Sequence, residues 1–134
     1  MATPITFEPK VGEQFIKYAR LLSARGYIHN TLGNMVIRVP HPDYKHGLAY
    51  TKHAEVSLEE MEIDNIVITD IPTSKIMWGE RITSIGHNLS REILRLRSDI
   101  DAVIHVHDDA TIALLGSKIT TVFNIISLDP PFVL

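Results

Sequence analysis

The chain has 134 residues, of which 45% are hydrophobic and 22% charged, and its net charge is −3. These values are typical of a globular protein, and we expect residues 1–134 to form one domain. Lysine and arginine are scattered, which argues against a nucleic-acid-binding stripe. No stretch approaches the ~18 apolar residues of a membrane span, and the N-terminus lacks the order of a signal peptide, so we expect a cytoplasmic protein that does not bind membranes.

Cysteine is absent from the chain, whereas histidine occurs seven times. Without cysteine there can be no disulfide, no thiolate nucleophile and no cysteine-ligated zinc. A metal bound by this chain must therefore use histidine, carboxylate or water as its ligands.

The first half of the chain predicts one helix and several strands. Residues 11–24 predict an amphipathic helix, because four apolar residues fall on one face and a glycine follows: Val11, Phe15, Ala19 and Leu22, then Gly26. Residues 29–34 predict a turn into a strand at 35–39, and residues 40–47, with two prolines, predict a connection to a short strand at 48–51. Ser57 and Glu60 match a capping box that predicts a short helical turn. A buried strand is expected at 66–69.

The second half predicts two more helices around a strand. After a turn at 72–74 and a candidate strand at 75–78, Asn88 can cap a helix whose apolar face is Leu89, Ile93 and Leu96. A strand is expected over 102–107, and Asp108 or Asp109 can cap a helix that ends at Gly116. Helices that alternate with strands favour layers of helix packed on a sheet.

His105 and His107 are two residues apart on the strand expected over 102–107. Side chains at this spacing point to one face, with Cα atoms roughly 6.6 Å apart, so both imidazoles can converge on one divalent metal. The spacing alone leaves open that one histidine is a hydrogen-bonded core residue and the other is exposed. A cupin would place such a pair in an all-β barrel, and an amidohydrolase would need a barrel of roughly 250 residues, so neither fits.

Several motifs occur in an order that resembles one family. They are Thr-Leu-Gly-Asn at 31–34, Tyr-Thr-Lys-His-Ala-Glu at 50–55, Ser-Leu-Glu-Glu-Met at 57–61, Asn-Ile-Val-Ile-Thr-Asp at 65–70 and Arg-Ser-Asp-Ile-Asp-Ala-Val-Ile-His-Val-His at 97–107. From about residue 10 onward the chain is similar to the class II aldolase/adducin head family, which includes fuculose-phosphate aldolase and ribulose-phosphate 4-epimerase. The resemblance implies an α/β/α sandwich around a mostly antiparallel sheet, a divalent metal such as zinc, and a homo-oligomer, commonly a tetramer.

The resemblance also implies roles for particular residues. His105 and His107 fall on two of the family's three metal-binding histidines, where a metal would polarise the carbonyl and hydroxyl oxygens of a small hydroxy-carbonyl or sugar-phosphate substrate. Thr83 and Ser84 fall on hydroxyl residues of the substrate side. Gly33 and Asn34 fall on a phosphate-binding loop, although a plain turn with Asn34 at positive φ explains them equally well.

The chain departs from the family pattern at its second phosphate loop and at its acid/base residue. In the loop, Ala54 and Glu55 replace a hydroxyl residue and a glycine, unless a shift by one residue places His53 and Ala54 there, where His53 and Lys52 could meet an anion. At the acid/base position the count lands on Gly86 instead of a carboxylate. His87 is a weak candidate for that catalytic role, against a capping or surface role, and Glu80 and Glu92 are less attractive.

The third departure is that the chain ends about where the family's C-terminal segment begins. That segment carries the third metal histidine and completes the sheet, so the third ligand is unidentified and we expect self-association to cover a free strand edge. Two functions remain open: a metal-dependent lyase or epimerase, and a non-catalytic oligomerisation or scaffold module that keeps the fold.

Overall fold

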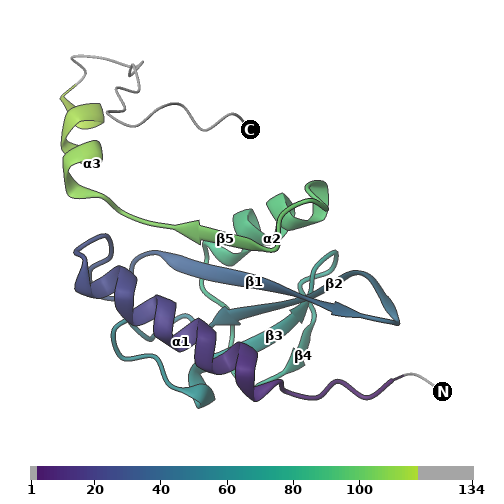
Figure 1. Cartoon of the computed structure of the whole chain (residues 1–134). Helices are drawn as coiled ribbons and strands as arrows, with labels where there is room; N and C mark the ends of the chain where they lie inside the picture. Colours follow the sequence, from purple (N-terminus) through teal and green to yellow (C-terminus); the bar gives the residue numbers. More distant parts are fainter. Residues whose placement is uncertain (1–2, 118–134) are drawn as a thin grey trace, which may run out of the picture.

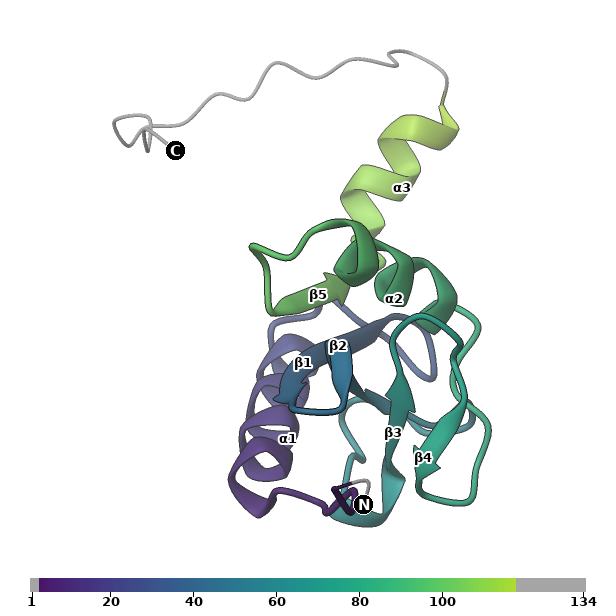
Figure 2. The same cartoon turned by 90° about the vertical axis from the view of Figure 1, so that its right-hand side faces the viewer.

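The computed structural model describes residues 3–117, which form a five-stranded sheet between helices (Figure 1). The strand order is β4-β3-β2-β1-β5, and every neighbouring pair is antiparallel. The elements in chain order are α1 (Pro9–Ala24), β1 (Asn34–His41), β2 (Tyr44–Lys52), the 3₁₀ helix η1 (Ile63–Asn65), β3 (Ile66–Asp70), β4 (Ile76–Trp78), α2 (His87–Leu96), β5 (Ala102–His105) and α3 (Asp109–Gly116). With α1 on one face of the sheet and α2 on the other (Figure 2), the expected α/β/α sandwich is confirmed.

Alternation along the central strands sends side chains to the two faces of the sheet. Met35 and Val39 of β1 belong to the larger core on the α1 side, while Val36 between them packs with Leu94 of α2. The two helical layers are therefore held by opposite faces of the same strands.

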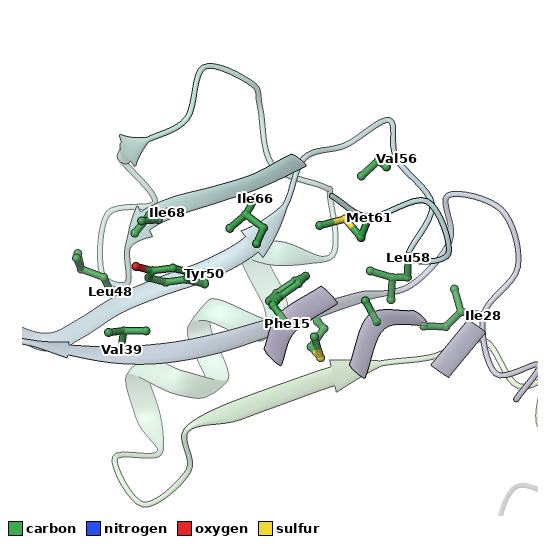
Figure 3. Packing of buried hydrophobic residues seen from close by; sticks show 12 residues of the cluster. Phe15, Ile28, Val39, Leu48, Tyr50, Val56, Leu58, Met61, Ile66 and Ile68 are labelled. Atoms are coloured by element: carbon green, nitrogen blue, oxygen red, sulfur yellow. The ribbon is translucent and has the colours of Figure 1, made fainter. Parts of the chain in front are cut away.

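The larger core is built around α1 (Figure 3). Phe15 and Ala19 are completely buried, as the helical periodicity predicts, and they lie in one cluster with Tyr50 of β2. Because truncating a buried phenylalanine to alanine costs about 3–5 kcal/mol, this contact is a principal tie between α1 and the sheet.

The connection expected over residues 40–47 is present but much shorter. β1 continues to His41 and β2 begins at Tyr44, so a tight hairpin joins them. Pro40 fits within β1 because β5 pairs only as far as Ile37, and because the register with β2 shifts between Val39 and His41. A proline without a backbone N–H is tolerated at such an irregularity.

The expected apolar face of α2 was wrong. Leu89 and Leu96 are 62% and 67% exposed, and the buried residues of the helix are His87, Ser90 and Leu94. The sheet surface under α2 carries the polar side chains of Asn34 and Thr69, which bind Ser90 and His87 respectively. A polar inner face is therefore satisfied by hydrogen bonds, and hydrophobic periodicity does not detect it.

The capping box at Ser57 forms a single turn. The backbone N–H of Glu60 donates to Ser57 Oγ at 3.2 Å and also to the Ser57 carbonyl oxygen at 3.2 Å. The regular 3₁₀ helix starts only at Ile63. The motif therefore closes the turn without extending it.

Helix α3 extends away from the sheet in both views (Figures 1 and 2). The side chain of Asp108 accepts a hydrogen bond from the backbone N–H of Thr111 at 2.8 Å, which confirms the expected N-cap. Ile112, Leu114 and Leu115 are exposed. No helix within residues 3–117 is both long and apolar enough to span a bilayer.

Candidate active site

The end of β5 brings His105 and His107 together. His105 pairs with Asn34 of β1, and the backbone N–H of His107 then donates to the Tyr27 carbonyl oxygen at 3.1 Å. The strand ends at His105, two residues earlier than expected, yet the two rings still lie with centroids 4.8 Å apart. The convergence expected from their spacing is present, and their metal-binding role stays a prediction.

Both histidines open into one pocket of about 390 Å³. The loop before β1, the loop after β2 and the start of α2 form the rest of its wall. The lining residues are Thr31, Leu32, Gly33, Ala54, Ser84, Ile85, Gly86, His105 and His107. Thr31 and Leu32 belong to the motif at 31–34 but were given no role from the sequence, and Ile85 was not singled out although it adjoins Ser84.

Gly33 packs directly on the strand that carries the histidines. Its φ is +68°, and a Cβ atom there would lie 2.7 Å from the His105 carbonyl oxygen. Only glycine suits both the backbone conformation and this close approach. The loop and the His105 backbone therefore form one wall of the pocket.

Asn34 is neither at positive φ nor on the wall of the pocket. The positive φ angles in this loop belong to Asn30 and Gly33, so the turn with Asn34 at positive φ is wrong. The Asn34 side chain is buried, donates through Nδ2 to Ser84 Oγ at 3.3 Å and accepts from Ser90 Oγ at 3.3 Å. It does not line the pocket and instead holds Ser84, which does.

Thr83 and Ser84 lie in different places relative to the pocket. Ser84 lines the pocket, and its hydroxyl can donate to a ligand while it accepts from Asn34. Thr83 is not among the lining residues, and it forms an isolated β-bridge with His53. Of the two hydroxyl residues, the pocket contains only Ser84.

Gly86 is the residue on which the count for the family's carboxylate lands, and it faces His105. A Cβ atom at this position would lie 3.1 Å from His105 Nδ1 and 3.2 Å from Asn34 Nδ2. Among the pocket residues that the structure describes, none is an aspartate or glutamate. The described part of the pocket therefore lacks an acid/base carboxylate.

His87 lies in the core under α2 and does not line the pocket. Its Nε2 is 2.9 Å from Thr69 Oγ1, and burial lowers the pKa of His87 to about 4. The ring is therefore neutral near pH 7. This placement favours a packing role over the weak catalytic role considered from the sequence.

The two nitrogens of His105 differ in access. Nδ1 is enclosed without a hydrogen-bond partner among the described residues, so Nε2 is the nitrogen left to reach a ligand in the pocket that His105 lines. An imidazole pair suits a divalent transition metal, but catalytic zinc normally has three protein ligands. Within residues 3–117 no three histidine, aspartate or glutamate side chains are grouped for a metal. A zinc ion bound by this pair would need a further ligand.

The second phosphate loop is shaped by buried side chains. Lys52 is completely buried, and Nδ1 of the buried His53 accepts from the backbone N–H of Glu55 at 3.2 Å. Burial lowers the pKa of both Lys52 and His53. His53 borders a second hollow of about 270 Å³, which also contains Arg81, a residue that no sequence signal distinguished. Because Ala54 lines both hollows, they are neighbours.

A family model describes the chain over most of its length. The class II aldolase and adducin N-terminal domain matches residues 13–122. The chain belongs to this family. The resemblance carried by the ordered motifs is thereby confirmed, and the paired histidines lie inside the matched region.

Known relatives of the chain include aldolases. The L-fuculose phosphate aldolase of Methanocaldococcus jannaschii is 30% identical over 123 residues, which cover 89% of this chain and 58% of that protein. A solved L-fuculose 1-phosphate aldolase has a TM-score of 0.69 and 26% identity, covering 81% of this chain and 49% of its own. YgbL from Klebsiella pneumoniae shares the fold, with a TM-score of 0.70 and 19% identity over 82% of this chain and 50% of its own. The chain thus spans about half the length of these relatives.

Proposed function

We propose that this chain is a metal-dependent domain of the class II aldolase type, a lyase or epimerase that acts on a small hydroxy-carbonyl or sugar-phosphate compound. The observation that carries the proposal is the convergence of His105 and His107 in one pocket of a chain that belongs to this family. The name of the M. jannaschii relative supports the substrate class.

In this proposal His105, through Nε2, and His107 hold a divalent ion, with zinc as the expected metal. The remaining ligand comes from outside residues 3–117 of this subunit. When bound, such an ion supplies Lewis-acid polarisation of the substrate's carbonyl and hydroxyl oxygens. Ser84 donates its hydroxyl to a substrate oxygen, and Gly33 lets backbone N–H groups approach an anionic group. Leu32 and Ile85 add exposed apolar side chains to the rim of the pocket.

The presence of a glycine at residue 86, in place of a carboxylate, favours a second candidate function. Because no carboxylate from the described chain lines the pocket, the fold can bind metal without an acid/base group. In this alternative the protein is a non-catalytic oligomerisation or scaffold module. Metal binding with no turnover would distinguish it from the lyase.

We infer that the protein is a cytoplasmic homo-oligomer, with a tetramer as the expected size. The support is an apolar groove between α1 and β5, to which Tyr18, Leu21, Tyr27 and Ile104 contribute side chains between 42% and 51% exposed. Apolar surface of this kind is stabilised when another surface covers it.

The test of the lyase is metal-dependent cleavage. Wild-type protein is loaded with Zn²⁺ and incubated with L-fuculose 1-phosphate and a panel of other ketose and aldose phosphates, and aldehyde release is measured. We expect release from at least one compound, and its loss in His105→Ala but not in His46→Ala, which changes the hairpin at the other end of β1. Bound zinc with no release from any compound would contradict the lyase and support the binding module.

A further inference from the structure

We propose that Lys52 is a positioning residue that holds two loops of the histidine pocket at their working separation. Lys52 is completely buried at the end of β2, and its Nζ donates to the Thr31 carbonyl oxygen at 2.8 Å and to the Val56 carbonyl oxygen at 2.7 Å. The inference rests on the proposed function, because it concerns the same pocket.

The two acceptors belong to different walls of the pocket. Thr31 lines the pocket itself. Two residues later, the backbone of Gly33 lies against the His105 carbonyl oxygen. Val56 is two residues after Ala54, which also lines the pocket. One ammonium group therefore ties the loop before β1 to the loop after β2.

The charge of Lys52 has no carboxylate within 4.0 Å in the part of the chain that the structure describes. Burying an unpaired ammonium is unfavourable, and burial accordingly lowers the pKa of Lys52. Hydrogen bonds from a charged donor are shorter and stronger than neutral ones, and both distances here are short. The bonds to the two carbonyls are thus the interaction that keeps the charged group inside.

Lys52 acts on the loops and not on the ligand. It does not line the pocket, and its Nζ donates to two backbone carbonyl oxygens. Without the ammonium, the Thr31 and Val56 carbonyls lose these donors. Other bonds still hold each loop to its neighbours, such as Leu32 N–H to His29 O and Ala54 N–H to Ile82 O. The expected effect is therefore local.

The absence of cysteine from the chain allows a matched chemical test. Lys52→Cys introduces a single thiol, which is alkylated in the unfolded protein with either 2-bromoethylamine or 2-bromoethanol before refolding. The first reagent restores an ammonium on a side chain of nearly lysine length, and the second gives a neutral side chain of the same length. Lys52→Met, expressed directly, provides the neutral comparison if the hydroxyethyl protein does not refold.

Two measurements distinguish an effect of Lys52 on the two loops from an effect on the position of the histidine pair. Amide hydrogen exchange at Leu32 and Ala54 reports on the loops, with Val67 in β3 as internal control. Titration with Co²⁺, followed by visible absorption, reports on the histidine pair. We expect the aminoethyl protein to match wild type, and the neutral proteins to show about tenfold faster exchange at the loop amides and about tenfold weaker Co²⁺ binding.

The proposal is overturned if neutral and aminoethyl proteins behave alike, or if the loops exchange faster while Co²⁺ affinity and spectrum stay unchanged. A wild-type protein that binds no Co²⁺ would instead remove the proposed metal function. In that case equal exchange in the two alkylated proteins would still overturn the anchoring role of Lys52, so the two failures are distinguishable.

Discussion

Gly86 and His105 face each other so closely that a Cβ atom at residue 86 would lie 3.1 Å from His105 Nδ1. That separation is tighter than ordinary van der Waals contact. Since Nδ1 is enclosed and unpartnered, Gly86 forms part of the wall that sets the direction of the ring. The position of the His105 ring therefore depends on the absence of a side chain at residue 86, just before α2.

Gly86→Ala is expected to weaken metal binding by displacing the His105 ring. The φ of Gly86 is −64°, which alanine adopts freely, so the effect comes from contact alone. Overpacking of this kind costs about 1–3 kcal/mol, and we expect Co²⁺ affinity to fall roughly tenfold in a visible-absorption titration. Gly116→Ala, where a Cβ meets nothing within 4 Å, is the control. Equal affinities in the two variants would contradict the contact.

Much of this arrangement follows from sequence, and the exceptions have physical causes. The period of α1, the buried run of β3 and the Asp108 cap are local signals, and each was predicted correctly. The inner face of α2 was not predicted correctly, because His87 and Ser90 hydrogen-bond to polar side chains on strands distant in sequence. Local hydrophobicity carries no information about such partners.

In the site too, a feature set by local sequence was predicted, and a feature set by contacts between distant segments was missed. The i, i+2 spacing predicted that His105 and His107 converge, since it depends only on strand geometry. The part played by Asn34 was missed, because its hydrogen bonds to Ser84 and Ser90 join segments brought together only by the fold.

Gly33→Ala should destabilise the protein more than Gly26→Ala. Both glycines have a positive φ, +68° and +76°, so both substitutions introduce backbone strain of about 1 kcal/mol. A Cβ at Gly33 would also lie 2.7 Å from the His105 carbonyl oxygen, whereas at Gly26 it meets nothing within 4 Å. We expect the Gly33 variant to lose roughly 1–3 kcal/mol more in urea unfolding. Similar losses in both variants would show that the loop does not pack on β5 as described.

The pKa of His87 predicts how stability depends on pH. Its folded value of about 4 lies below the ordinary value of 6.5, so between these pH values the unfolded chain binds a proton that the folded chain excludes. The contribution is fully present above pH 6.5 and is lost as pH falls toward 4, by roughly 3 kcal/mol in the free energy of unfolding. Urea unfolding at several pH values measures this slope.

The control for the pH experiment removes both partners of the buried hydrogen bond. The double variant Thr69→Val with His87→Leu leaves neither group unpaired, so its slope between pH 4 and 6.5 should be shallower than that of wild type. His53 contributes a smaller slope of the same sign in both proteins, because burial lowers its pKa as well. An unchanged slope in the double variant would show that His87 is not the group responsible.

Self-association is expected to depend on the groove between α1 and β5. Leu21 and Ile104 are 42% and 49% exposed in this groove. We expect wild-type protein to sediment as a multimer, and Leu21→Glu with Ile104→Glu to shift it toward monomer. A wild-type monomer at micromolar concentration would contradict the proposed assembly.

The central claim is that His105 and His107 bind a divalent metal, and elemental analysis tests it most directly. Protein purified without a polyhistidine tag is equilibrated with Zn²⁺, freed of excess metal and analysed for zinc per chain. We predict about one zinc per chain for wild type and His46→Ala, and its loss in His105→Ala and in His107→Ala. No zinc in wild type, or equal zinc in all four proteins, would contradict the account.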